Sequence, residues 1–436
     1  MPPLPNGKAY IQYSLMTEIK KTLVNRVREI IARLGRFFKM DMAYIASGAF
    51  WGNANYLFLT ILALTTSVLF ARYLTKDQYG TYQYVLSIAG IISTTTLTGM
   101  NSAVVRAVAR GFEGELRRTV KFQIILGIIP TVISLGVAVW YLIQGNNSLT
   151  LSFLWVAMFL PLANALNTWV AYASGKKAWR VGTYYGFANS FISYAGVIAM
   201  VYFTRSFVWV AFGNFFFGML GNFVMYRLLL KRFKPNDKTD PETIPYGTHL
   251  SLQALPGAIP GQLDSLLVYH FVGPAALAVY TFATLIPEKL SGSLKFASNL
   301  ALPKFSERSE SHVKKFLIKK MGWMFIIIGA VTAVYVLFAP FVFHIFFPAY
   351  NASIPFTQVY SLSFFSLIPG MIQSALVSQK KTKALYILSF LNPAIRTVLL
   401  AVLMYYFNVW GIVWAQIIQN FMMIPIQMAF LDGEKK

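Results

Sequence analysis

Five side chains of the Asp, Glu, Lys and Arg types fall well inside long apolar stretches of this 436-residue sequence: Asp264, Glu288, Lys289, Lys295 and Arg396. A charged group in such surroundings needs either a partner or a function, because its desolvation costs several kcal/mol, on the order of 3 on insertion scales. The basic groups could hold an anionic phosphate, and Arg suits this role because its planar fork donates two hydrogen bonds at once. The carboxylates could bind a coupling ion or take part in gating.

Polar residues accompany these charges at helical spacing. From Glu288, the spacing i, i+3, i+4, i+7 and i+11 reaches Lys295 and Asn299 on one helix face, and Asn392 precedes Arg396 by one turn. In the alternative interpretation, Glu288 and Lys295 only neutralise each other within a packed helix bundle. The residues expected to bind substrate are Lys295, Arg396, Lys289, Asn299, Asn101 and Asn392. Those expected to act in ion coupling or gating are Glu288 and Asp264.

The elements that must position these residues are about twelve apolar stretches. A bilayer core of about 30 Å is crossed by roughly 20 apolar residues in a helix. The chain is 56% hydrophobic and only 12% charged. We therefore predict an all-α integral membrane protein with these spans: 43–72, 82–104, 122–144, 150–173, 182–203, 206–228, 247–272, 279–302, 321–347, 354–377, 385–407 and 409–431.

The seventh predicted span contains two Pro-Gly pairs, at Pro256-Gly257 and Pro260-Gly261. Proline removes a backbone donor and kinks or breaks a helix. The pattern predicts a broken helix, which could be a moving gate or a static kink.

Basic residues alternate between the gaps that separate the predicted spans. Of the 38 Lys and Arg, 32 lie at the chain ends, in the even-numbered gaps or, as Arg227 does, at the end of a span that leads into one. The odd-numbered gaps hold only Lys76 and Arg205, with Arg72 at the end of the first span. Because Lys and Arg favour the cytoplasmic side of a membrane, this distribution predicts that both termini are cytoplasmic.

The two halves of the chain resemble each other. At a shift of 198 residues Asn101 aligns with Asn299, and at a shift of 204 a Lys pair at 176–177 aligns with one at 380–381. Six spans in each half would give copies that run in the same direction, with a central cavity between the two lobes. The predicted organisation is an N-terminal lobe at 41–228, a cytoplasmic linker at 229–246 and a C-terminal lobe at 247–436.

Residues 1–40 are basic, and apolar residues recur in them at helical spacing. This pattern indicates an amphipathic helix that lies on an anionic membrane surface. The alternative is that translation begins at Met16 or Met40, in which case part or nearly all of this segment does not belong to the protein.

Several classes of protein are disfavoured by the sequence. Nucleic-acid binding is not expected despite the net charge of +23, because the basic residues are distributed among membrane segments. There is no Cys, the four His show no metal-ligand spacing, and no P-loop or dinucleotide fingerprint is found. A transporter without cofactor or metal, driven by an ion gradient or by substrate supply, is expected rather than an enzyme.

Three segments of the first half carry a recognisable pattern: SGAFWG at 47–52, LFARYLTKDQYGTY at 69–82 and LTGMNSA at 97–103 followed by Arg106. Together they resemble the opening of Wzx-type polysaccharide flippases of the MOP superfamily, which also contains lipid II flippases and MATE exporters. The resemblance implies two six-helix lobes and a multi-pass protein of the bacterial inner membrane.

The activity implied by the resemblance is transfer of an undecaprenyl-diphosphate-linked oligosaccharide, such as an O-antigen unit of lipopolysaccharide, to the outer leaflet by alternating access. Its implied partners are this substrate, membrane lipids, a polysaccharide polymerase and chain-length proteins. In the family, cationic cavity residues engage the substrate, and here that chemistry falls on Lys295 and Arg396. The alternatives are a MATE-like exporter of organic cations that uses Asp264 and Glu288, a lipid II flippase, a membrane glycosyltransferase, and a structural partner of the assembly machinery.

Overall fold

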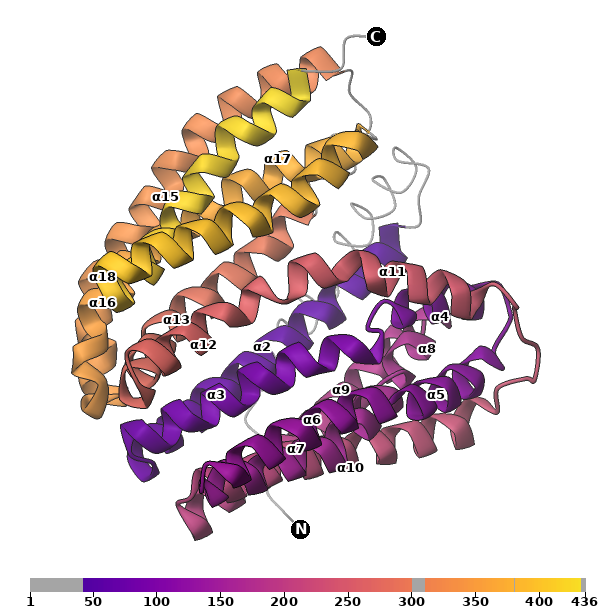
Figure 1. Cartoon of the computed structure of the whole chain (residues 1–436). Coiled ribbons are helices and arrows are strands. Elements are labelled where there is room, and N and C mark those ends of the chain that lie inside the picture. Colours follow the sequence, from indigo (N-terminus) through magenta and orange to yellow (C-terminus); the bar gives the residue numbers. More distant parts are fainter. Residues whose placement is uncertain (1–41, 300–309, 380, 433–436) are drawn as a thin grey trace, which may run out of the picture. The chain divides into compact units, whose positions relative to one another are not determined.

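A computed structural model describes residues 42–299, 310–379 and 381–432, without the side chains of 42–53, 256, 258, 293–299, 310–320 and 432. The chain divides into two units, Met1–Tyr56 and Leu57–Lys436. All regular structure in the described ranges is helical, which confirms the predicted all-α class (Figure 1). The predicted amphipathic segment 1–40 lies outside these ranges.

The first half contains α2 (Met42–Tyr73), α3 (Lys76–Ser93), α4 (Met100–Ala109), α5 (Glu115–Leu126), α6 (Ile128–Ile143), α7 (Asn147–Leu166), α8 (Trp169–Gly175), α9 (Trp179–Thr204) and α10 (Phe207–Phe233).

The second half continues with helices of more varied length. They are α11 (Thr243–Ala258), α12 (Pro260–Phe271), α13 (Pro274–Asn299), α15 (Glu310–Phe346), α16 (Ile354–Tyr360), α17 (Leu367–Ser378) and α18 (Thr382–Asp432), with short 3-10 helices at 94–96, 348–353 and 361–366. Among the described residues, eight helical stretches are long and apolar enough to cross a membrane, or nine if one bent pair counts as a span. The chain is thus a multi-pass membrane protein, and the count of twelve spans stays a prediction.

The second predicted span, 82–104, is not one straight helix. Helices α3 and α4 meet at a bend of 47°, and Leu97 between them has a left-handed φ of +59°. The hydroxyl groups at 93–96 each bond to the carbonyl three residues earlier, which competes with regular helix geometry. At Gly99 an added Cβ would lie 2.6 Å from the backbone N of Ser251, so the break allows α11 to approach closely.

The break predicted in the seventh span lies at its second proline. Helix α11 runs through Pro256 and Gly257, and α12 begins at Pro260. Proline is well accommodated in the first turn of a helix, where the missing N–H has no intrahelical partner. The two segments therefore meet at Ile259.

The last two predicted spans are joined within α18. Asn408 has φ +50° and ψ −129°, which is not helical. A Cβ on Gly411 would lie 2.0 Å from the carbonyl oxygen of Leu403, so the chain folds back on itself here. Helix α18 thus has a first segment, 382–407, and a second segment, 409–432.

Helices from the two halves of the chain pack against each other mainly through α3, which contacts α12 and α13, while α4 contacts α11. At one end of this contact, a Cβ on Gly80 would lie 1.8 Å from the carbonyl oxygen of Pro274. Beside it, the rings of Tyr79 and Phe282 lie 4.9 Å apart, and those of Phe282 and Tyr350 lie 3.8 Å apart. Gly80 therefore permits a backbone contact that no other residue would allow. The division into two lobes stays a prediction.

The segment that joins α10 to α11, residues 234–242, is held against the loop between α4 and α5. The N–H of Gly114 donates to the Lys238 carbonyl at 3.0 Å, and the N–H of Asp240 donates to buried Glu115 at 2.9 Å. Arg110 pairs with Asp240 at 3.2 Å. This segment is shorter than the predicted linker because α10 and α11 extend into it from both sides.

Glu113 adds a further set of contacts in the same loop. It accepts from Lys176 Nζ at 2.7 Å and from the Tyr172 hydroxyl at 2.8 Å, and its own N–H donates to Asn236 at 3.3 Å. Partial burial, the largest single influence, raises the pKa of Glu113. The hydrogen bonds from Lys176 and Tyr172, the charge of Lys176 and a hydrogen bond from the Asn236 backbone together outweigh it. The net effect lowers the pKa of Glu113 below its ordinary value.

Candidate functional site

Arg396 and Asp264 form a buried ion pair between α18 and α12. Arg396 Nη2 donates to Asp264 Oδ2, and the Tyr280 hydroxyl donates to the same oxygen at 2.9 Å. The side chains of Arg396 and Asp264 are only 13% and 9% exposed. Because removal of one member would leave an uncompensated buried charge, each residue depends on the other.

The second amino group of Arg396 is directed at amide side chains. Nη1 donates to Gln416 Oε1 and, at 3.0 Å, to Gln419 Oε1. Gln419 Nε2 in turn donates to Asn392 Oδ1 at 2.5 Å and to the Asn392 carbonyl at 3.2 Å. The two segments of α18 are thereby connected around the guanidinium group, with Asn392 and Arg396 on the first and Gln416 and Gln419 on the second.

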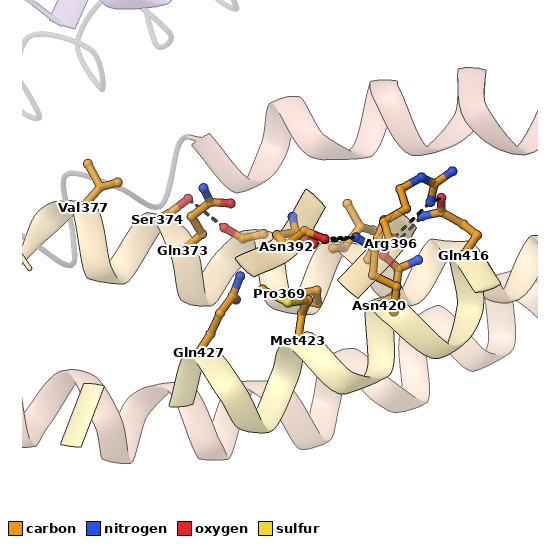
Figure 2. A pocket seen from close by; sticks show the side chains of 14 residues that line it. Pro369, Gln373, Ser374, Val377, Asn392, Arg396, Gln416, Asn420, Met423 and Gln427 are labelled. Carbon is orange, nitrogen blue, oxygen red and sulfur yellow. Dashed lines mark hydrogen bonds between the residues drawn. The ribbon is translucent and has the colours of Figure 1, made fainter. Parts of the chain in front are cut away.

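These residues line a cavity of about 610 Å³, which we call the amide cavity (Figure 2). Gln416, Asn420, Met423 and Gln427 are arranged along the second segment of α18. Two buried polar atoms on this segment, Asn420 Nδ2 and Gln427 Oε1, have no hydrogen-bond partner among the described residues. Amides that both donate and accept suit a ligand rich in hydroxyl groups. The remaining lining residues are Ser366, Leu367, Pro369, Gly370, Gln373, Ser374, Val377, Asn392, Arg396 and Gln419.

A second cavity, of about 300 Å³, contains Glu288 and Lys289 of α13 in its wall. We call it the tyrosine cavity because Tyr79, Tyr82 and Tyr194 also line it. Glu288 Oε1 accepts a hydrogen bond from the Tyr360 hydroxyl at 3.2 Å, and that hydroxyl comes from the end of α16. The remaining lining residues are Ala63, Thr66, Ser67, Phe70, Gln83, Leu86, Ser193, Val197, Asn214, Thr281, Thr284 and Leu285.

The structure brings together some of the residues expected from the sequence and separates others. Arg396 and Asn392 line the amide cavity, and Arg396 also pairs with Asp264, whereas Glu288 and Lys289 lie at the tyrosine cavity. Asn101 lies in the first turn of α4, where its buried Oδ1 has no partner among the described residues. The side chains of Lys295 and Asn299 lie outside the described part of the chain. The assigned roles of all eight residues stay predictions.

Neither the ion pair nor the amides of α18 were expected from the sequence. Gln416, Gln419, Asn420 and Gln427 follow the spacing i, i+3, i+4 and i+11 within the last predicted span. The same periodicity that selected Glu288 and Lys295 would have found them, had uncharged amides been considered with the ionisable groups. Among the described residues no group of three or more His, Cys, Asp or Glu could hold a metal ion.

Comparisons with known proteins agree with this architecture. A family model described as "Polysaccharide biosynthesis protein" matches residues 45–309. None of the curated proteins matches the chain in sequence. A multidrug-resistance MATE transporter of the MOP superfamily in its inward-facing conformation has a similar structure, with a TM-score of 0.68 and 15% identity over 87% of this chain and 96% of that one.

A second similar structure is a MOP superfamily transporter from Pyrococcus furiosus, with a TM-score of 0.58 and 15% identity over 89% of this chain and 96% of that one. Its description states that reversed polarity of the binding pocket suggests a different function for that protein. At this level of identity both likenesses show the fold, which is that of the MATE transporters.

Proposed function

The chain belongs to the polysaccharide biosynthesis protein family, and from this premise we propose that it is a flippase for lipid-linked saccharides. Its substrate would be an oligosaccharide on undecaprenyl diphosphate, carried from the inner to the outer leaflet of the bacterial inner membrane. In the proposed orientation both termini are cytoplasmic, because 32 of the 38 basic residues lie at the ends or in and beside the even-numbered gaps. A polysaccharide polymerase and chain-length proteins are the proposed partners.

The observation that carries this proposal is the composition of the amide cavity. Its polar groups are amides and hydroxyls, which exchange hydrogen bonds with sugar hydroxyls in both directions. Its one cation, among the described lining residues, is Arg396, whose charge is already balanced by Asp264. A cavity of this kind favours a neutral, hydroxyl-rich body such as a saccharide.

The diphosphate would then be held by cations of α13. Lys289 lies in the wall of the tyrosine cavity, and Lys295 follows it on the same helix by six residues. A phosphate has three or more acceptor oxygens, and an ammonium group offers three donors to them. Lys295 and Lys289 are therefore the proposed headgroup contacts, with Arg396 and Asn392 assigned to the saccharide. Asn299 and Asn101 remain proposed as further polar contacts.

Export of organic cations is less favoured by the geometry. Such a substrate needs an available carboxylate, yet Asp264 is paired with Arg396 and hydrogen-bonded by Tyr280. Glu288 accepts a hydrogen bond from Tyr360 and keeps its proposed role in ion coupling or gating.

The test is a flipping assay in proteoliposomes that contain a fluorescent polyprenyl-diphosphate saccharide. Gln416→Met and Gln419→Met preserve side-chain length but remove the amide, so each should lose about 1 kcal/mol, or roughly fivefold, in saccharide affinity. Gln144→Met, in the exposed turn after α6, is the matched control and should flip at the normal rate.

In cells, Lys295→Ala should reduce surface polysaccharide at normal protein levels, and so should the double variant Asp264→Asn/Arg396→Gln, which leaves no buried charge without a partner. Lys121→Ala on the exposed face of α5 should not reduce it. Unchanged surface polysaccharide in both variants would remove the case for cationic contacts. Absence of flipping by the wild-type protein would overturn the flippase proposal itself.

A further inference from the structure

An apolar groove of about 350 Å³ lies between α2 and α9. Leu62 and Leu69 of α2 line it together with Phe191 and Ile198 of α9. The lining residues extend over 62–73 in α2 and 191–203 in α9, which at 1.5 Å per residue is roughly 17 Å. Half of a hydrocarbon core of about 30 Å has nearly the same depth. The groove is therefore long enough to follow a lipid chain through one leaflet.

The tyrosine cavity lies on the other side of the same two helices. Thr66 and Ser67 of α2 and Ser193 of α9 line that cavity, one helical face away from the groove residues. Tyr194 lines both the cavity and the groove. A polar chamber and an apolar groove thus adjoin at one side chain, which is the geometry required by a ligand with a polar body and an apolar chain.

An exposed cation marks one end of the groove. Arg205 follows the last turn of α9, and its guanidinium carbon lies 5.6 Å from the centre of the Tyr73 ring at the end of α2. The rings of Tyr73 and Tyr202 lie 5.7 Å apart at this end. The proposed orientation places this end at the outer surface, at the depth where tyrosines and arginines meet lipid headgroups.

We propose that α2 and α9 form the exit portal through which the lipid-linked saccharide passes into the outer leaflet. During release the isoprenoid chain occupies the groove, and the diphosphate moves from Lys289 in the wall of the tyrosine cavity to Arg205. The saccharide leaves the amide cavity and follows through the tyrosine cavity past Tyr194. This inference rests on the proposed flippase function. A phospholipid could place a chain in the groove, but it has no hydroxyl-rich body for the adjoining chamber.

The test is photolabelling in nanodiscs with a polyprenyl-diphosphate saccharide that carries a diazirine in its isoprenoid chain. Labelled peptides are expected within 57–73 and 179–204. Ala199→Trp and Ala195→Trp fill the groove, and Arg205→Gln removes the cation, so each should lower this labelling several-fold. Two matched controls should label normally. Ala333→Trp lies on the exposed face of α15. Arg227→Gln replaces an exposed arginine that lies 5.8 Å from the Phe223 ring, at the other end of the spans.

Labelling confined to other helices, or unchanged in the groove and Arg205 variants, would overturn the portal. Competition by phosphatidylglycerol as strong as that by unlabelled polyprenyl diphosphate would also overturn it, because the groove would then hold bulk lipid only. Flipping measured in parallel separates the two proposals. Normal flipping with labelling elsewhere discards the portal alone, whereas no flipping by the wild-type protein discards the flippase proposal.

Discussion

Arg396 on α18 reaches Asp264 on α12 across 132 positions of sequence, and the two side chains form a buried ion pair. The pair fixes the first segment of α18 against the helix that follows the break at Ile259. The same guanidinium group orients Gln416 and Gln419 in the amide cavity. One interaction therefore serves both the packing of the helices and the shape of the cavity.

Single substitutions in this pair should be more harmful than the double substitution. Asp264→Asn or Arg396→Gln leaves a buried charge without its partner, at a cost of about 3 to 5 kcal/mol in stability. The variant with both substitutions should recover most of this loss, because two neutral side chains remain in place of two charges. Thermal unfolding of the purified protein in detergent measures the effect.

The exposed pair Arg117–Asp237 supplies the control for that experiment. Its side chains are 50% and 91% exposed, so Asp237→Asn should change the unfolding temperature very little. Equal loss of stability in the single and double variants of the buried pair would show that the two charges do not compensate each other.

The orientation can be tested directly because the natural sequence contains no Cys. Asn147→Cys lies at the exposed start of α7, and Lys231→Cys lies in the exposed last turn of α10. A membrane-impermeant thiol reagent should label Asn147→Cys in intact cells and Lys231→Cys only after permeabilisation. Labelling of both from the same side would contradict the proposed topology.

Substitution of Gly80 should separate α3 from α13 at one end. An alanine Cβ would lie 1.8 Å from the Pro274 carbonyl oxygen, and this backbone atom has no rotamer by which to move away. Gly80→Ala should therefore speed the labelling of Thr281→Cys, in the wall of the tyrosine cavity, by an impermeant thiol reagent added from outside. Gly136→Ala on α6, where a Cβ meets nothing within 4 Å, should leave the labelling rate unchanged. An unchanged rate in Gly80→Ala would show that this contact does not limit access.

The segment 234–242 should loosen under acid conditions. The folded-state pKa of Glu113 lies below its ordinary value of 4.5, so its contribution to stability is present above that value and is lost as pH falls through the folded pKa. The anisotropy of a fluorophore on Lys238→Cys should decrease in this acid range. Glu113→Gln should remove the decrease, and a decrease that persists in this variant would assign it to another group.

The apolar runs predicted most helices well because a membrane helix must remain apolar over a length that the bilayer sets. The predicted span 182–203 corresponds to α9 at Trp179–Thr204, and 206–228 to α10 at Phe207–Phe233. The bend at Leu97 was missed because a left-handed leucine has no composition signal, unlike the proline that ends α11. Its geometry depends on the close approach of α11 to Gly99, which is a tertiary contact.

The candidate site was predictable only in part. Charge in an apolar run identified Asp264 and Arg396 separately, but periodicity describes one helix and cannot pair residues on two. The amides around Arg396 are polar without being ionisable, so the cost of burying charge did not single them out. Their arrangement around Arg396 depends on the turn at Asn408, which places the two segments of α18 side by side.

The docked segment 234–242 has a mechanical consequence for the proposed alternating access. Hydrogen bonds to the α4–α5 loop restrict the movement of this segment, which connects α10 to α11. A rocking motion of the two halves would then have to be absorbed elsewhere. Leu97 is suited to it because its left-handed backbone ends regular helix, and Ile259 because Pro260 after it lacks the N–H of a helical hydrogen bond. Gly99, two residues after Leu97, lies against α11, the helix that ends at Ile259. We therefore expect the backbone at Leu97 and at Ile259 to bend together.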